Sequence, residues 1–588
     1  MEFEAWAVLG VIFLCFGVLF STRVPPDLVF IGGLTVLITG NIVQPSEALV
    51  GFSNQGMLTV AALYVVAAGL KETGAIQLII THLLRQPKNL FSAQSRLITP
   101  VMAMSAFLNN TPIVASFIPA LQDWAKKNNI TISKLMIPLS YAAILGGTCT
   151  LIGTSTNLLV HGLLIEDQGR TLNIFEPAIV GIPIAIAGSI YLLTIGRKLL
   201  PERTSGFKNF ENTREYTIEM VVNSENSIVG KSVDEAGLRH LQGLYLVEII
   251  RNGQIIAAVT SDELIHNHDR LIFTGLVDSI VELRQIPGLI PATSQVFKLD
   301  APMRERVMAE AVVSQSNPLN GMTIKEGGFR NRYNAVILAV SRRGERVNEN
   351  IGDIRLQTGD MLLMEAPPNF VRKFKFSNDF FLVTKLSENG TPDFKRTWVS
   401  LTIITGMVLS AAFGIFTMFQ AAILAAGLMI VTKCCRISVA RDSIDWPVLL
   451  VIAAALGIGN ALQTTGAATI IAGGLIQMAD TNPHLALMAT YLATWLLTEM
   501  ITNNAAAVLI FPIAISIAAS IGVSYMPFVM IIIFAASASF ATPIGYQTNL
   551  MVYGPGGYKF TDYLKIGLPL NIIVAAVAIT LVPLVWEF

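Results

Sequence analysis

Two short polar stretches lie inside otherwise apolar parts of this sequence, and their residues could bind ions. The first, FLNNTPIV, brings Asn109, Asn110 and Thr111 into residues 97–121, which contain no charged side chain. Burying an amide group without a hydrogen-bond partner costs about 1–3 kcal/mol, so such residues need a reason to be there. An Asn side chain offers an oxygen to a hard cation such as sodium and an N–H to the oxygen of an anion. This stretch therefore predicts an ion-binding site.

The second polar stretch repeats the first. TEMITNNAAAVLIFP aligns with it at an offset of 393 residues. Two further pairs of blocks, LKETGA with LQTTGA and TNLLVHG with TNLMVYG, each lie 392 residues apart. Three matched blocks at nearly one offset indicate a duplicated unit. The alignment pairs Ser105 with Thr498, Asn109 with Thr502, Asn110 with Asn503, Thr111 with Asn504 and Pro119 with Pro512.

A second pair of segments predicts the other wall of the site. GGTCTLIGTSTN (146–157) and ASFATPIGYQTN (538–549) are rich in Gly, Pro and small hydroxyl residues, which favour a break in a helix. Such breaks would free backbone carbonyls near Gly153 and Gly545 to face the two polar stretches. Close packing of helices through small residues is the alternative interpretation of these segments.

The absence of charge around the first stretch predicts how a bound anion would be neutralised. Co-bound cations and helix dipoles would have to supply the positive charge. Ser105 and Thr498, one turn before the two tips, add hydroxyl oxygens for a cation. This favours sodium coupling over proton coupling, which usually uses a carboxylate inside the membrane. Glu499 is the one acidic residue nearby, and it keeps a proton-linked mechanism open.

The whole chain has the composition of a membrane protein with a water-soluble insert. Of its 588 residues 53% are apolar and 14% are charged, against about a quarter charged in typical soluble proteins. Between Arg441 and Lys559 there is no Lys or Arg, whereas residues 203–396 carry many charges of both signs. We expect a multi-pass protein of the cell (inner or plasma) membrane, in contact with the lipid bilayer. Apolar runs long enough to cross it occur at 5–21, 26–43, 55–70, 136–162, 174–196, 397–415, 417–432, 447–463, 524–553 and 565–586.

Basic loops predict the orientation, because they stay on the cytoplasmic side. They place residues 203–396 in the cytoplasm, together with both ends of the first polar stretch, which is therefore expected to be a re-entrant hairpin (about 97–121). The second stretch (about 485–518) has no basic flank and is expected to enter from outside. The expected fold class is an α-helical polytopic membrane protein whose halves, 1–202 and 395–588, form an inverted repeat. The alternative is that both hairpins are ordinary spans.

The insert has a repeat of its own. Residues 227–253 align with residues 318–344 at an offset of 91 without a gap. This predicts two tandem cytoplasmic α+β domains, 207–297 and 298–390, with the sequence RNG forming a tight hairpin in the first. A regulatory small ligand bound to an Arg-bearing surface is one interpretation of the insert, and a passive dimerisation lobe is the other. The arginines of that surface are Arg239, Arg251, Arg330 and Arg342.

The membrane motifs resemble those of the divalent anion:sodium symporters, a family within the ion transporter superfamily. Its members carry two hairpins with Ser-Asn-Thr tips, each facing a Gly-rich unwound helix. Both tips here keep the central Asn but depart from the pattern around it, notably at Asn504, where Thr is expected. The resemblance implies a homodimeric, elevator-type symporter with an anion between the tips, contacted by Asn110, Thr111, Asn503 and Asn504. It implies a first sodium site at Ser105, Asn109, Asn110 and backbone near Gly153, and a second at Thr498, Thr502, Asn503 and backbone near Gly545.

The insert resembles two TrkA C-terminal (RCK C-terminal) domains, which are regulatory modules of potassium transport systems. Bacterial and algal family members with such paired inserts are similar to sodium/sulfate transporters. Sulfate is therefore the preferred substrate, since a compact dianion does not need the two distant carboxylate clamps of a dicarboxylate. The alternatives are a sodium-coupled dicarboxylate transporter and a membrane anion sensor that does not transport. No enzyme activity, covalent cofactor, metal other than sodium or nucleic-acid partner is expected.

Overall fold

Two helices are buried along their whole length in the computed structural model of the protein. They are α8 (Met136–Gly147) and α22 (Met526–Ser537), and neither carries a charged residue. Each ends at a segment without helical structure, after which α9 (Ser155–Gln168) and α23 (Gln547–Tyr553) begin. Both predicted helix breaks are therefore present, within the segments 146–157 and 538–549.

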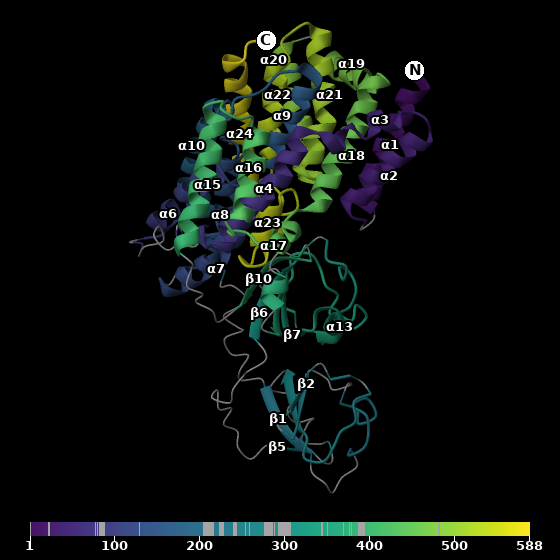
Figure 1. Cartoon of the computed structure of the whole chain (residues 1–588), viewed down its shortest axis with the longest axis vertical. Coiled ribbons are helices and arrows are strands. Elements are labelled where there is room, and N and C mark those ends of the chain that lie inside the picture. Colours follow the sequence, from purple (N-terminus) through teal and green to yellow (C-terminus); the bar gives the residue numbers. More distant parts are fainter. Residues whose placement is uncertain are drawn as a thin grey trace. The chain divides into compact units, whose positions relative to one another are not determined.

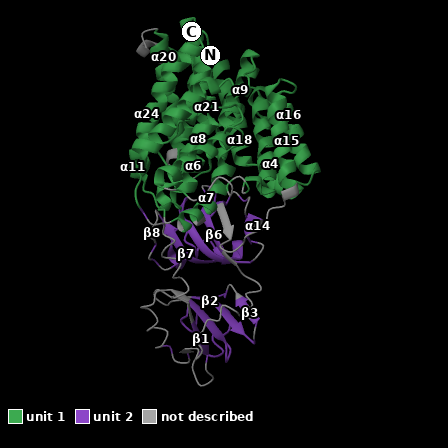
Figure 2. Ribbon diagram, turned by 90° about the vertical axis from the view of Figure 1, so that its left-hand side faces the viewer, with its two compact units in different colours: residues 1–202, 390–588 green, residues 203–389 purple. Residues whose placement is uncertain are grey.

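The chain divides into two compact units, which Figure 2 distinguishes by colour. The helical unit comprises residues 1–202 and 390–588, and the insert comprises residues 203–389. The structure describes all residues except 1, 22–23, 77, 79, 81–86, 88, 129, 204–216, 223–227, 239–243, 253, 258, 261, 276–285, 287–288, 292–306, 315, 343–344, 348, 350, 368–369, 375–376, 378, 386–393 and 480–481.

The helical unit contains two series of helices in a similar order (Figure 1). The first series is α1 (Glu2–Ser21), α2 (Pro26–Thr39), α3 (Pro45–Ala48), α4 (Gln55–Glu72), α6 (Leu90–Ser105), α7 (Asn110–Lys127), α8, α9, α10 (Ala178–Tyr191) and α11 (Arg197–Leu199). The second series is α15 (Phe394–Ala412), α16 (Met418–Val431), α17 (Ile437–Asp442), α18 (Trp446–Thr464), α19 (Ala467–Ala479), α20 (Pro483–Met500), α21 (Asn503–Ile521), α22, α23 and α24 (Phe560–Val585).

Packing within this unit pairs helices of one series with helices of the other. In a first group, α4 packs on α16 and α2 packs on α18. In a second group, α10 packs on α24 and α23 packs on α8, while α6 covers α8 and α20 covers α22. The second group therefore holds both helix breaks and both polar stretches.

The outer surface of the unit is apolar. On α10, the side chains of Ile179, Ile182, Ile186 and Ile190 are each at least half exposed. Their spacing of three and four residues makes one stripe along the helix, as expected for a face in contact with lipid. Among the described residues, four helical segments are long and apolar enough to cross a membrane: Ala178–Leu199, Trp446–Thr464, Asn503–Ile521 and Phe560–Val585.

One helix has no counterpart among the predicted spans. Helix α19 has 13 residues and is about 20 Å long, which is shorter than the hydrocarbon core of about 30 Å. It follows directly after Gly466, whose φ of 75° is left-handed and favours glycine. The sequence TTGAATI thus turns the chain from α18 into α19, whereas no helix was predicted directly after the span 447–463.

The insert contains two five-stranded antiparallel sheets (Figure 1). Strands related by 91 residues occupy equivalent places, because the order β3-β2-β4-β1-β5 of the first sheet corresponds to β8-β7-β9-β6-β10 in the second. The first sheet has β1 (Thr217–Val222), β2 (Leu244–Arg251), β3 (Gln254–Ala257), β4 (Arg270–Gly275) and β5 (Leu289–Pro291). The second has β6 (Val307–Val313), β7 (Val336–Arg342), β8 (Glu345–Arg346), β9 (Met361–Ala366) and β10 (Phe380–Lys385), with α13 (Phe329–Tyr333) and α14 (Phe370–Phe374) beside it.

Turn geometry explains why particular residues repeat in the insert. Gly230 and its equivalent Gly321 have φ values of 82° and 80°, which side chains disfavour. The predicted RNG hairpin is confirmed, since Arg251 pairs with Gln254 across a two-residue turn that contains Asn252 at a φ of 51°. Each sheet also has its own hydrophobic core, with Leu271 and Phe273 in the first and Phe329 and Phe380 in the second, among others.

Candidate functional site

The first helix break meets the first polar stretch. Helix α6 ends at Ser105, whose hydroxyl donates to the carbonyl of Ala143 in α8 at 2.7 Å and to the Asn110 amide oxygen. A Cβ on Gly153 would lie only 2.7 Å from the Ser105 carbonyl oxygen and 2.6 Å from that of Gly147. Glycine is therefore required for the two backbones to approach. The result is a cluster of oxygen atoms that would suit a small hard cation.

Three of the four residues predicted for the first sodium site are brought together here: Ser105, Asn110 and Gly153. Asn109 lies in the same break between α6 and α7, but its side chain forms no hydrogen bond with the described residues and is partly exposed. Its predicted ligand role therefore stays a prediction. The hydroxyl of Thr150, which was not predicted, bonds to the Ala106 carbonyl and accepts from the Gly153 N–H at 3.2 Å.

The second break has the same construction around the second polar stretch. The hydroxyl of Thr498 donates to the carbonyl of Ala536 at 2.8 Å, as Ser105 does to Ala143. Thr502 is the N-cap of α21 and accepts from the Ala505 N–H at 3.4 Å. The Gly545 N–H donates to the Thr542 hydroxyl at 3.0 Å, as Gly153 does to Thr150. Predicted residues Thr498, Thr502 and Gly545 therefore all belong to this break.

Two asparagines hold the breaks in shape. The amide of Asn157 donates to the carbonyls of Gly147 at 3.3 Å and Thr150 at 2.7 Å. At positions 392 residues later, the amide of Asn549 donates to the carbonyls of Ser539 at 2.9 Å and Thr542 at 3.1 Å. Each asparagine thus satisfies carbonyls that the unwound backbone leaves without helical partners. Sequence reasoning had these residues in the repeated TNL block but assigned them no role.

The two repeats meet at a polar centre, where each tip contacts the break of the other repeat. The amide oxygen of Asn504 accepts from the hydroxyls of Ser155 at 3.2 Å and Thr156 at 3.0 Å. The equivalent residue Thr111 donates to the amide oxygen of Gln547 at 3.1 Å. These contacts join residues of one repeat to residues of the other. The difference between Thr111 and Asn504 therefore lies where the two repeats meet.

Tyr546 is the residue of this centre that sequence reasoning missed most clearly. Its hydroxyl accepts from the Asn110 amide at 2.7 Å, lies 3.3 Å from the Thr154 hydroxyl and interacts with the Asn503 side chain. The comparison of GTSTN with GYQTN at an offset of 392 was the available signal, since it aligns Tyr546 with Thr154. Predicted substrate residues Asn110, Asn503 and Asn504 all lie at this centre.

Helix ends determine the electrostatics of the site. Helices α7, α9 and α21 begin at the polar centre, so their positive N-terminal ends favour an anion there. Helices α6, α8, α20 and α22 end at the breaks, where free carbonyls favour a cation. The side chains of the centre that make the contacts above are all neutral.

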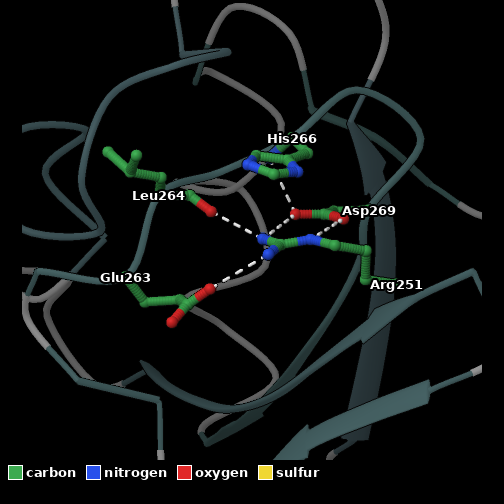
Figure 3. A network of polar contacts seen from close by, with 5 residues as sticks. All are labelled: Arg251, Glu263, Leu264, His266 and Asp269. Carbon is green, nitrogen blue, oxygen red and sulfur yellow. Dashed lines mark hydrogen bonds and ion pairs between the residues drawn. The ribbon is translucent and has the colours of Figure 1, made fainter.

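The described arginines of the predicted surface of the insert form hydrogen bonds with other groups of the insert. Figure 3 shows Arg251 donating to both oxygens of Asp269 at 3.0 and 2.9 Å, to Glu263 at 3.1 Å and to the Leu264 carbonyl at 2.6 Å. The His266 N–H donates to the same Asp269 carboxylate at 2.8 Å. The hydrogen bonds with Asp269 are the main cause that raises the pKa of Arg251.

The other described arginines of that surface also bond inside the insert. Arg342 donates to both oxygens of Asp360 at 2.8 Å, and Arg330 donates to the carbonyls of Val259 and Leu246 in the first domain at 3.3 and 3.4 Å. Arg239 lies outside the described residues. These arginines therefore connect different parts of the insert. The regulatory ligand stays a prediction.

Other candidate chemistry is limited. Among the residues that the structure describes, no group of three or more His, Cys, Asp and Glu side chains could hold a metal ion. His161, which the sequence analysis did not use as a ligand, accepts from the Leu172 N–H at 3.2 Å through Nδ1.

Comparison with known families decides the class of protein. The citrate transporter (CitMHS) family matches residues 16–526, which is most of the chain. The chain belongs to the citrate transporter family. The divalent anion:sodium symporters, to which the motifs point, lie with this family in the ion transporter superfamily. Membership makes the protein a transporter-family membrane protein and favours a role other than enzyme catalysis.

Several relatives within this family carry names that concern sulfur. "Putative sulfur deprivation response regulator" of Chlamydomonas reinhardtii is 35% identical, covering 96% of this chain and 99% of its own length. "Sodium/sulfate cotransporter 2" of the same organism is 28% identical, covering 96% of this chain and 88% of its own length. An uncharacterized transporter of Synechocystis sp. is 32% identical, covering 96% of this chain and 94% of its own length.

Proposed function

We propose that the protein is a secondary active transporter that couples the uptake of a divalent oxyanion, preferably sulfate, to sodium. One observation carries this proposal. The N-termini of α7, α9 and α21 converge on amide and hydroxyl groups from both repeats, with no charged side chain among the contacts. A compact anion bound there would be held by neutral donors and helix dipoles.

Sodium supplies the charge that such a site lacks. The oxygen clusters at the two breaks would each bind a sodium ion, the first with Ser105, Asn110 and backbone near Gly153. The second would use Thr498, Thr502, Asn503 and backbone near Gly545, as the first site does in its repeat. Sodium then neutralises the dianion locally, so binding of one favours binding of the other.

The arrangement of the helices supports an elevator mechanism. The second helix group contains both breaks and both polar stretches, whereas the first group contains α2, α4, α16 and α18. A rigid movement of one group against the other would carry the whole site without rebuilding it. Homodimerisation through the first group, a cytoplasmic location for the insert and a regulatory role for its two TrkA C-terminal-like domains belong to the same proposal.

The names of relatives support sulfate, while the family description favours a carboxylate. Sodium/sulfate cotransporters of Chlamydomonas cover most of this chain, and the matching family is described as citrate transporters. Citrate or a dicarboxylate is therefore the second candidate substrate. A dicarboxylate would need two separated clamps, whereas the centre described above is one compact set of donors.

Uptake into proteoliposomes tests the proposal. We expect labelled sulfate to accumulate with an inward sodium gradient and not with potassium or choline in its place, and excess citrate or succinate to leave uptake unchanged.

The variant N504A should raise the KM for sulfate about tenfold, because one charge-assisted hydrogen bond is worth about 1.5 kcal/mol. The control N460A alters an amide of α18 that bonds to the Glu47 carbonyl and forms no hydrogen bond with the described residues of either tip, so it should transport normally.

Three other results would each support a different function. Sodium-driven uptake of citrate or succinate without sulfate uptake would replace the substrate by a carboxylate. Sulfate binding without counterflow in sealed vesicles would indicate a sensor that does not transport. Uptake driven by a proton gradient alone would remove sodium from the mechanism.

A further inference from the structure

Glu499 is an acidic residue in the last turn of α20, at the second helix break. Its Oε1 accepts from the Ala541 N–H at 3.0 Å and from the Asn571 amide at 3.1 Å. Its Oε2 accepts from the hydroxyls of Thr542 at 2.7 Å and Ser539 at 3.2 Å. The carboxylate is therefore held in one position by the break and by α24.

The negative charge of Glu499 has no positively charged partner among the residues that the structure describes. All four donors are neutral, and no Lys, Arg or His among the described residues forms an ion pair with it. A carboxylate at a membrane helix break is costly unless something neutralises it. A cation bound beside Glu499 would therefore lower the free energy of the folded state.

An unpaired oxygen atom beside the carboxylate points to such a ligand independently. The Asn571 amide donates to Glu499, while its own Oδ1 is buried without a hydrogen-bond partner among the described residues, and the residue is 2% exposed. Buried acceptors normally have a donor, and an oxygen next to a carboxylate without one is a ready ligand for a hard cation.

The first repeat cannot offer the same group. Glu499 aligns with Ala106, and there the hydroxyl of Thr150 bonds to the backbone carbonyl of Ala106 in place of a carboxylate. Gly181 of α10 and Gly567 of α24 lie against equivalent backbone carbonyls, those of Thr148 and Phe540. Gly181 therefore corresponds to Gly567 when α10 is compared with α24. That alignment places Ala185 opposite Asn571. Both oxygen-bearing side chains are therefore alanines in the first repeat.

We propose that Glu499 and Asn571 are further protein ligands of the sodium ion at the second break, so that this site has a carboxylate that its counterpart in the first repeat lacks. The inference rests on the proposed sodium coupling and deepens it, because it makes the two halves of the transporter electrostatically different. Gly545 belongs to the same site, since a Cβ there would lie 2.9 Å from Glu499 Oε2 and 2.1 Å from the Ser539 hydroxyl. A cation held by a carboxylate binds more tightly than one held by neutral oxygens alone.

Sodium-dependent thermal stability of the purified full-length protein tests this site without requiring transport. The melting temperature is followed while NaCl replaces choline chloride at constant ionic strength, and the sodium concentration that gives half of the total rise is the readout. We expect E499Q to raise that concentration at least about tenfold and N571A to raise it about threefold or more. The control N460A should leave it unchanged.

The readout separates ligand binding from a purely structural role. A variant that only loses packing would melt lower in choline yet keep the wild-type sodium midpoint, and that result would overturn the inference. The same midpoint in wild type and in both variants would overturn it while sodium coupling survives. A wild-type protein that sodium does not stabilise at all would remove the proposed coupling as well. Because N571A keeps the carboxylate, it remains informative if E499Q does not fold.

Discussion

At the scale of single residues, the polar centre binds through neutral groups. Asn110, Asn504 and Tyr546 connect the two repeats by hydrogen bonds of 2.7 to 3.2 Å, without a charged side chain among them. Such a centre would release an anion more readily than one with an arginine, because no positively charged side chain adds its attraction to the hydrogen bonds. Weak, numerous contacts suit a protein that has to bind and release in each cycle.

Replacement of Tyr546 by Phe tests the centre. Y546F removes the acceptor of the Asn110 amide and leaves a buried donor unpaired, which costs about 1–3 kcal/mol. We expect the melting temperature to fall by several degrees and the KM for sulfate to rise about tenfold. The control is Y491F, because the Tyr491 hydroxyl is buried without a hydrogen-bond partner and its loss should cost nothing. Equal effects of the two variants would show that the Tyr546 hydroxyl has no special role.

Residues of the insert allow a second test at this scale. Asp269 is fully buried and bonds to Arg251 through both oxygens (Figure 3). D269N should destabilise the first sheet by about 1–3 kcal/mol, measured as about 5- to 150-fold faster hydrogen exchange of amides in β2 and β4. The matched control is E219Q, which breaks the half-exposed pair of Glu219 with Arg270 on the same sheet and should cost at most about 1 kcal/mol.

The pKa of Arg251 gives the pH dependence of this effect. Its hydrogen bonds with Asp269 raise the pKa above that of an unfolded arginine, so the stabilisation is fully present below the unfolded-state pKa and is lost only as pH rises through the still higher folded-state pKa. The loss in D269N should therefore be the same at pH 7 and pH 9. A loss that disappears between these two values would contradict this account of the pair.

At the scale of helices and breaks, what distinguishes a re-entrant hairpin from a span is how deeply its polar tip lies within the helical unit. Ser105 and Thr498 bond to the last turns of α8 and α22, the fully buried helices. Helix α8 has 12 residues before the break and α9 has 14 after it, so the first tip lies level with the middle of this broken helix. This supports re-entrant hairpins, although α21 by itself is long enough to span.

Opposite entry of the two hairpins predicts opposite labelling of their outer ends. In a variant without cysteine, K127C lies at the end of α7 and S520C lies near the end of α21, both at exposed positions. We expect a membrane-impermeant thiol reagent to label S520C in intact cells and K127C only after the membrane is opened. The four native cysteines, Cys15, Cys149, Cys434 and Cys435, are all free, so their replacement breaks no disulfide. Labelling of both positions from one side would exclude the inverted repeat.

At the scale of the whole molecule, the insert is attached to both helix groups. The chain before it is held by Ser133, whose hydroxyl donates to the Pro201 carbonyl at 2.7 Å, and by Lys134, which donates to the Leu200 carbonyl at 2.6 Å. Both residues directly precede α8. The chain after it is held by Thr397, whose hydroxyl donates to the Thr73 carbonyl at the end of α4 at 2.6 Å. A change in the insert could therefore act on the relative position of the two groups.

Release of the first attachment should imitate removal of the insert. We expect K134M and deletion of residues 207–390 to change the KM or the maximal rate of sulfate uptake in the same direction, by about two- to tenfold, which corresponds to about 0.4–1.4 kcal/mol. The control E202Q removes an ion-pair partner that is 78% exposed and should have no effect. A deletion that alters transport while K134M does not would show that the insert acts by another route.

Much of the local structure could be predicted because it depends on short-range chemistry. Glycine and proline placed the breaks near Gly153 and Gly545, apolar runs placed most helices, and the offset of 91 predicted the equivalent strands. Helix α19 was missed because its 13 residues are fewer than the roughly 17 or more that a membrane span requires. The pairing of Arg251 with Asp269 could not be predicted, because it depends on strand register, which composition does not reveal.

The sequence by itself determined the duplicated unit and the polar tips, since side-chain chemistry and spacing are local properties. Only the tertiary structure decided which tip faces which break. Asn504 meets Ser155 and Thr156, Thr111 meets Gln547, and Asn110 meets Tyr546, each across more than 300 residues of chain. Such contacts are decided by the packing of whole helices, and packing also decided that the Glu499 carboxylate lies beside the unpaired oxygen of Asn571.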